Sequence, residues 1–275
     1  MLKKLLKYEW KATARYFLPV YGLLFAMAAA SRISWLFSEI DSVWNRVVEV
    51  TLLMGYIFLF AGVFVATFIV IAYRFYKNMF TDEGYLTFTL PVSIKDLLLS
   101  KTIIAFVWTI LSTVIAILSI MILMLGYVQF GPLFQQFGEF WNELMRAMDA
   151  YAPHSWLVAT EVLLLIILSL VGWVLKIYAS FAVGQLTGKH KILLAVGAYF
   201  GFGVVEQFLG TALLLALPYL DYTAISQMDA VVVGEIILLM FLLLQLVFTA
   251  AYGVLTWILM KRKDNLQERG GMNET

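Results

Sequence analysis

Three carboxylates lie inside long apolar runs of this chain, where a charged group is costly and therefore informative. Glu161 and Glu235 are about one to two helical turns from the end of their runs, whereas Glu206 lies deeper, in GAYFGFGVVEQFLG. Ionisable groups at such positions often mark a pathway for ions or substrates. We expect Glu161 and Glu235 to lie near lipid headgroups or along such a pathway. Glu206, with the adjacent Gln207, is expected in a pathway or gate, in a buried hydrogen bond with Gln207 or Gln245, or simply at the lipid-facing edge.

Other patterns that carry chemistry are missing from the sequence. The chain has no cysteine and two histidines, His154 and His190, which the topology below places on opposite sides of a membrane. No thiolate site, histidine metal cluster or catalytic triad is therefore expected within one chain. The segment 184–190, GQLTGKH, is one residue short of a phosphate-binding loop between its glycines and has His190 where a Ser or Thr would bind magnesium. We expect a short basic turn there, and no metal or nucleotide bound by this chain.

The composition defines the elements that must position these groups. Of 275 residues, 63% are hydrophobic and 13% are charged. Six apolar runs reach the roughly 20 residues needed to cross a hydrocarbon core of about 30 Å. Because lipid cannot satisfy backbone polar groups, and alternating barrel strands are missing, the runs are expected to be helices. The sequence predicts an all-α polytopic protein with spans at 17–37, 47–73, 102–127, 155–178, 192–217 and 231–260.

The basic residues predict how these spans are oriented. All but Arg32, Arg46 and Arg146 fall near one side when six crossings are drawn. Basic residues accumulate on the cytoplasmic side of a membrane, so both termini, including the tail 261–275, are expected in the cytoplasm. We expect the first span to be retained, and the chain to form one membrane domain over 1–275. The net charge of +1 gives no indication of a nucleic-acid partner.

The first sixteen residues have the pattern of an amphipathic helix. Leucines and aromatics share one face of a helical wheel, and lysines and Arg15 share the other. Such a helix is expected to lie at the cytoplasmic interface, at the least as a basic anchor. Glu9 stands in the middle of the apolar face, where a carboxylate is unfavourable unless another group pairs with it. A partner protein that touches this helix would explain Glu9.

The polar segment 74–101 is the longest interruption on the cytoplasmic side. Ser93 with Asp96 forms a helix start after Pro91, and 81–83 has the composition of a helix N-terminus. Between them the aromatic residues Tyr85 and Phe88 share a face. A short capped helix that shows aromatics to the cytoplasm suits a groove on a partner protein. The alternative is a connector that packs on its own bundle.

These residues carry a family resemblance. The run EGYLTFTLPVS at 83–93, followed by a basic residue and a leucine-rich span, resembles the cytoplasmic loop of ABC-2 type transporter permeases. The leader LLKYEWKATARYFLP is similar to the amphipathic connecting helix at the start of such permeases, especially in Gram-positive bacteria. The resemblance covers the whole chain in topology, but only these two motifs are specific.

The resemblance implies the membrane subunit of a bacterial ABC exporter in the cytoplasmic membrane. A separate P-loop ATPase would bind ATP and magnesium, and a second permease, identical or paralogous, would complete the transporter. The coupling helix would be 82–91. The resemblance places these residues at the ATPase interface: Glu9, Asp82, Glu83, Gly84, Tyr85, Leu86, Phe88 and Pro91. The ATPase activity would reside in the partner, so the chain itself is not expected to be an enzyme.

The substrate and two rival functions stay open at this point. An apolar, aromatic interior with few charges favours an amphipathic or hydrophobic cargo such as a peptide, drug or lipid. A non-transporting sensor or immunity protein that binds a membrane-active ligand fits the same sequence. A membrane-embedded enzyme would need a catalytic pair that the sequence does not offer, and a channel would need a regular polar stripe.

Overall fold

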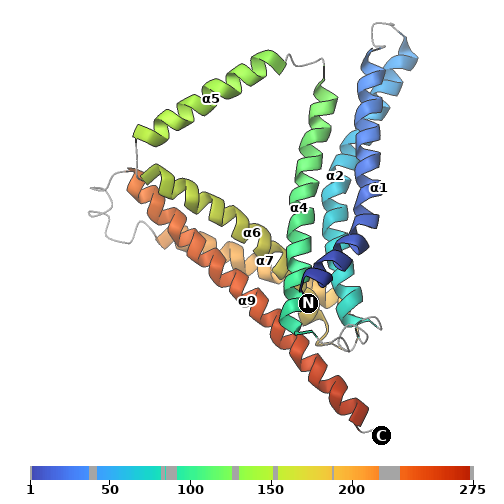
Figure 1. Cartoon of the computed structure of the whole chain (residues 1–275), viewed down its shortest axis with the longest axis vertical. Helices are drawn as coiled ribbons and strands as arrows, with labels where there is room; N and C mark the ends of the chain where they lie inside the picture. The colour runs from blue at the N-terminus through green and yellow to red at the C-terminus, as the bar shows by residue number, and fades with distance from the viewer. Residues whose placement is uncertain are drawn as a thin grey trace. The chain divides into compact units, whose positions relative to one another are not determined.

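A computed structural model describes residues 2–36, 42–81, 84, 92–125, 130–150, 154–187, 189–216 and 230–272, and its elements there are helices (Figure 1). Their bounds are α1 Leu2–Leu36, α2 Val43–Phe80, α4 Ile94–Met124, α5 Phe130–Ala150, α6 His154–Gly184, α7 Lys191–Ala216 and α9 Ala230–Met272. All except α5 are long and apolar enough to cross a membrane. The predicted all-α class with six spans is therefore confirmed, and the described part of each predicted span falls within or next to one of these helices.

The chain divides into two compact units. Unit 1 comprises residues 1–77 and 96–137, and unit 2 comprises residues 78–95 and 138–275. Unit 1 therefore contains α1 with most of α2 and α4, whereas unit 2 contains α6, α7 and α9. The expectation of one membrane domain stays a prediction.

In unit 1, α1, α2 and α4 pack around an aromatic core. Their buried residues are Phe17, Tyr21, Leu24 and Ala28 from α1, Tyr56 and Val63 from α2, and Ile104 and Trp108 from α4. Many other apolar side chains of these helices are exposed, among them Phe58 and Val65. Outward apolar side chains are what lipid requires, so the small buried core is consistent with a membrane helix bundle.

The helix α1 joins the predicted interfacial leader to the first span without a break. It is continuous from Leu2 to Leu36, and Pro19 lies inside it. Proline removes one intrahelical hydrogen bond and its ring clashes with the preceding turn, which bends a helix without necessarily ending it. Figure 1 shows the first part of α1 turning away from the direction of the rest. The leader is thus the bent first part of one long helix.

In unit 2, α6 packs on both α7 and α9. Two glycines of α6 permit close approach. A Cβ on Gly172 would lie 2.6 Å from Nε2 of Gln245 on α9, and a Cβ on Gly184 would lie 2.6 Å from the carbonyl oxygen of Lys191. His190, with a φ of 60°, completes the tight turn before α7. In the near match to a phosphate-binding loop, Gly184 is therefore explained by helix packing.

The helix α5 covers Phe130–Ala150 and is amphipathic. Phe134, Phe137 and Phe140 are more than half exposed. Exposed aromatics on an amphipathic helix suit a position in the membrane interface.

Candidate functional site

Glu206 lies in an ion-pair cluster that joins three helices of unit 2. Its Oε2 accepts a hydrogen bond from Nζ of Lys176 on α6 at 2.5 Å. Its Oε1 accepts one from the hydroxyl of Tyr252 on α9 at 2.8 Å. We call Lys176, Glu206 and Tyr252 the Glu206 cluster. Glu206 is hydrogen-bonded within the bundle as expected, but the bonds are only partly buried and their partners are these two residues rather than Gln207 or Gln245.

Aromatic residues and a glycine surround the ammonium group of Lys176. Its Nζ lies 5.0 Å from the centre of the Tyr199 ring, a distance at which the ring face attracts a cation. The Tyr199 hydroxyl in turn accepts a hydrogen bond from Nε1 of Trp173 at 3.2 Å. A Cβ on Gly203 would lie 3.3 Å from the same Nζ. Glycine at 203 therefore makes room for the lysine head.

A cavity of about 520 Å³ opens beside the Glu206 cluster, between α6, α7 and α9. Its polar lining consists of Ser169, Lys176, Glu206, Gln207, Thr211 and Gln245, and its apolar lining includes Leu165, Leu214, Phe241, Leu244 and Phe248. Gln207 donates to the Thr211 hydroxyl at 3.4 Å. Pockets that bind small amphipathic molecules combine an apolar wall with a few such polar groups.

The charge balance of the Glu206 cluster limits its chemistry. One carboxylate faces one ammonium, and the second carboxylate oxygen already accepts a hydrogen bond from the Tyr252 hydroxyl. A general base needs a free carboxylate within reach of the substrate proton, whereas this one is engaged on both sides. The arrangement suits a polar contact for a ligand or a bond that opens and closes between helices.

The other two intramembrane carboxylates lie elsewhere in unit 2. Neither Glu161 on α6 nor Glu235 on α9 lines the 520 Å³ cavity, whereas Glu206 and Gln207 do. Both are half-buried. Among the residues that the structure describes, Oε2 of Glu161 is buried without a hydrogen-bond partner. The four predicted pathway residues thus do not form one group.

Glu9 has two cationic partners in unit 1. Its Oε1 accepts a hydrogen bond from Arg74 on α2 and its Oε2 one from Lys101 on α4, both at 3.2 Å. The side chains are only 14% exposed for Glu9, 11% for Arg74 and 6% for Lys101. We call these three residues the Glu9 clamp. Because the partners are within the chain, the burial of this carboxylate does not need a partner protein.

Aromatic stacking beside the Glu9 clamp attaches α1 to the core of unit 1. The Trp108 ring of α4 lies between Trp10 and Phe17 of α1, at centroid distances of 4.4 and 4.5 Å. Its Nε1 donates a hydrogen bond to the Thr13 hydroxyl at 2.8 Å, and that hydroxyl donates to the backbone carbonyl of Glu9. The first turns of α1 are therefore fixed to α4 by stacking, hydrogen bonds and an ion pair together.

Hydroxyl groups extend these contacts deeper into unit 1. Ser112 of α4 is within hydrogen-bond distance of the hydroxyls of Tyr21 and Thr67, at 2.7 and 2.8 Å. Ser119 of α4 lies 3.0 Å from the Tyr56 hydroxyl. Such bonds between spans contribute to helix association in lipid. These residues were not predicted from the sequence, although the two serines recur at a spacing of seven, two helical turns, along α4.

Most of the predicted coupling residues lie outside the described residues, namely Asp82, Glu83, Tyr85, Leu86, Phe88 and Pro91. Gly84 is described and buried, and its N–H donates to the carbonyl of Thr81 at 2.8 Å. A Cβ at this position would lie 2.9 Å from the carbonyl oxygen of Met79. A glycine is thus required where the chain turns after α2.

Comparison of the chain with protein-family models, with curated proteins and with solved structures gave no match. The structure defines the chain as a helical membrane protein, and any narrower class rests on its residues and their geometry.

Proposed function

We propose that this chain is the permease subunit of a bacterial ABC exporter. It couples ATP hydrolysis by a separate nucleotide-binding subunit to the export of an amphipathic or hydrophobic substrate. The proposal starts from the resemblance of 83–93 and of the leader to ABC-2 type permeases. Its structural support is the Glu9 clamp, because this clamp links the same two regions of the chain.

The clamp connects the leader to both ends of the predicted coupling loop. Arg74 lies six residues before the end of α2 at Phe80, and Lys101 lies seven residues after the start of α4 at Ile94. At 1.5 Å per residue, each cation is about 10 Å along its helix from the loop. One carboxylate on α1 therefore joins the two helices from which the loop emerges. A displacement of the loop would be passed to α1, α2 and α4 together.

The predicted interface residues have different roles in this proposal. Tyr85 and Phe88 are the proposed anchors on the ATPase, since buried aromatics commonly dominate such interfaces. Glu9 has both oxygens engaged within the chain, so its predicted contact with the ATPase depends on the resemblance alone. Its proposed contribution is to hold the leader beside the loop.

The cavity beside the Glu206 cluster supports the substrate class. Its wall is polar and apolar in nearly equal parts, and its polar groups include an ion pair and two amide side chains. Such a lining suits a molecule with an apolar body and a polar end, as a membrane-active peptide, a drug or a lipid has. Both termini and the coupling loop are proposed to face the cytoplasm, where the ATPase would bind.

The first test is purification of the chain from its native host in mild detergent, with identification of co-eluting proteins and an ATPase assay. We expect a P-loop ATPase in near-equal amount, and a second permease unless the chain pairs with itself. Changing Tyr85 and Phe88 together to Ala should weaken docking by about 2 kcal/mol or more and remove the ATPase from the eluate.

The matched control changes Phe134 and Phe137 on α5 to Ala, which removes two exposed aromatics from a different segment. This variant should retain the ATPase. If the unaltered chain elutes without an ATPase under conditions that preserve its oligomer, the exporter proposal fails. The non-transporting sensor or immunity protein then becomes the better explanation.

A further inference from the structure

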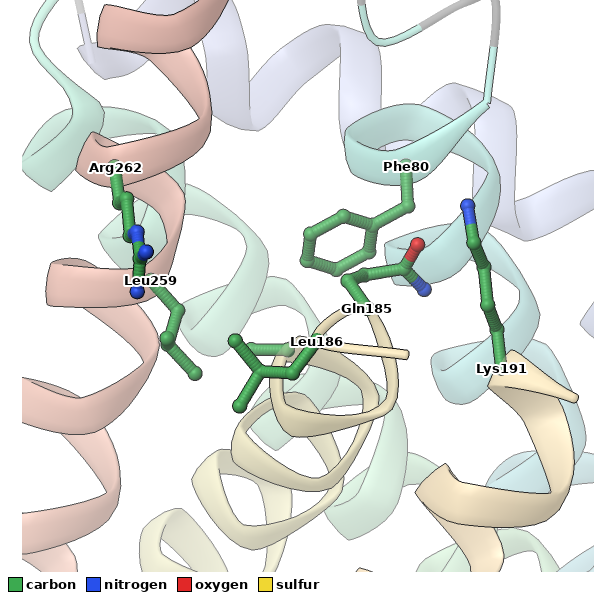
Figure 2. Close-up of a pocket in the computed structure, with 7 residues that line it drawn as sticks. Phe80, Gln185, Leu186, Lys191, Leu259 and Arg262 are labelled. Atoms are coloured by element: carbon green, nitrogen blue, oxygen red, sulfur yellow. The ribbon is translucent and has the colours of Figure 1, made fainter. Parts of the chain in front are cut away.

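A second pocket of about 420 Å³ lies in unit 2, where the end of α6 meets the start of α7 (Figure 2). Its lining includes Gln185 and Leu186 after α6, Lys191 at the start of α7, and Leu259 and Arg262 on α9. Phe80 at the end of α2 completes it. Figure 2 shows Arg262 and Lys191 on opposite walls, with Phe80, Gln185 and Leu186 between them.

The polar groups of this pocket favour an anion. Arg262 and Lys191 are cations, and none of the described residues that line the pocket is acidic. In the same described part of the chain, Nε2 of Gln185 is buried without a hydrogen-bond partner. A buried N–H group without an acceptor is unfavourable, and a ligand oxygen would relieve that cost. Two cations and an unsatisfied amide donor together suit a phosphate or a carboxylate.

Neighbouring residues place the pocket near a membrane interface. Trp257 of α9 lies two residues before Leu259, and Nζ of Lys95 and of Lys261 lie 5.6 and 5.3 Å from its ring centre. Tryptophan with lysines around it is typical of the level of the lipid headgroups. Beyond this level towards the helix centre, α9 is apolar. These neighbours suit a pocket at the depth where phospholipid phosphates lie.

We propose that this pocket binds the headgroup of an acidic phospholipid. The phosphodiester would contact Gln185 and one of the two cations, and the remainder of the headgroup would reach the cation on the opposite wall. Leu186, Leu259 and Phe80 would contact the glycerol and the first acyl carbons. The two cations on opposite walls favour an extended headgroup over a single inorganic ion. The proposal requires only that the chain lies in a membrane and is independent of the exporter function.

The test compares phosphatidylglycerol with phosphatidylcholine on the full chain. Detergent-purified protein is incubated with an equal mixture of the two lipids, and the bound lipids are counted by native mass spectrometry. We expect a clear preference for phosphatidylglycerol. Gln185→Glu, which replaces the amide donor with a carboxylate of the same shape, should reduce that preference about tenfold. Lys191→Gln with Arg262→Gln should reduce it about fivefold or more.

The matched control is Lys189→Gln, a change of an exposed lysine in the same turn that does not line the pocket. It should keep the preference, which separates a built site from general attraction to basic residues. Far-UV circular dichroism of each variant shows whether the helices are intact. Equal retention of both lipids by the unaltered chain, or no effect of Gln185→Glu in a folded variant, would overturn the proposal. So would inorganic phosphate, if it displaced phosphatidylglycerol at equal concentration, since the occupant would then be a soluble anion.

Discussion

Glu206 is bonded through both carboxylate oxygens, and this double contact determines what its loss would do. In Glu206→Gln the ammonium of Lys176, a buried residue, would lose its counter-charge. Removing one partner of a buried ion pair commonly costs about 3–5 kcal/mol. We expect a clear fall in the thermal midpoint of the detergent-solubilised chain, followed by tryptophan fluorescence or circular dichroism.

A double variant separates the pair from its single groups. Lys176→Met with Glu206→Leu removes both charges and should destabilise the chain by less than the sum of the two single changes. Additive losses would show that Lys176 and Glu206 act independently, against the geometry of the cluster. Activity of the double variant in the native host would also show whether the charges serve transport or only packing.

Glu9 has a different electrostatic situation, because one carboxylate faces two cations. Glu9→Gln would leave Arg74 and Lys101 close together without a negative charge, so we expect destabilisation by about 3 kcal/mol or more. Limited proteolysis should also cut the first part of α1 faster, since the clamp fixes it. Glu139→Gln on α5 changes an exposed carboxylate and should leave both measurements unchanged. If Glu9→Gln behaved like this control, the Glu9 clamp would contribute neither to stability nor to the protease resistance of α1.

The packing of helix pairs depends on small residues at particular positions. Gly172→Ala would place a methyl group 2.6 Å from Nε2 of Gln245 and 2.8 Å from the Thr249 hydroxyl, so both side chains would have to move and the contact between α6 and α9 would be disturbed. We expect a loss of about 1–3 kcal/mol in stability. Gly201→Ala on α7 meets nothing within 4 Å and should be neutral or mildly stabilising. Equal effects of the two changes on the thermal midpoint would contradict the close α6–α9 contact.

The elements were easier to predict than their contacts. Apolar runs of about 20 residues define spans because the bilayer fixes the length, and all six spans are confirmed as helices. The partner of Glu206 was missed because the predicted span ended at residue 178, which put Lys176 at the membrane edge. The helix continues to Gly184, so Lys176 lies inside it. Tyr252 was one aromatic among many, and no local pattern marks a hydroxyl that bonds to another helix.

The leader also shows that contacts between distant residues cannot be predicted from local sequence patterns. The helical wheel of the leader correctly identified Glu9 as a carboxylate on the apolar face that needs partners. The partners are 65 and 92 residues away along the chain. Sequence spacing carries no information about such distant pairs unless the packing of α1 on α2 and α4 is known. A partner protein was therefore the simplest expectation, and the structure supplies Arg74 and Lys101 as partners within the chain.

At the scale of the whole molecule, the distribution of basic residues predicts the orientation in the membrane. The chain has no cysteine, so single cysteines can be introduced without removing native ones. Cysteines at Lys4 and Thr275 should react with an impermeant maleimide only after cells are permeabilised. A cysteine at Gln136 in α5 should react in intact cells. Labelling of either terminus in intact cells would reverse the orientation and remove the proposed site for a cytoplasmic ATPase.

The pairing of Lys176 with Glu206 also constrains how the chain is made. Each charge alone would oppose insertion of its helix into lipid by about 2.5–3.5 kcal/mol near the centre of the bilayer. The two residues lie on consecutive helices, α6 ending at Gly184 and α7 beginning at Lys191, and they neutralise one another only when both helices are present. During synthesis, we therefore expect α6 to remain in the translocon until α7 has been synthesised, so that the two helices enter the bilayer together as a helical hairpin.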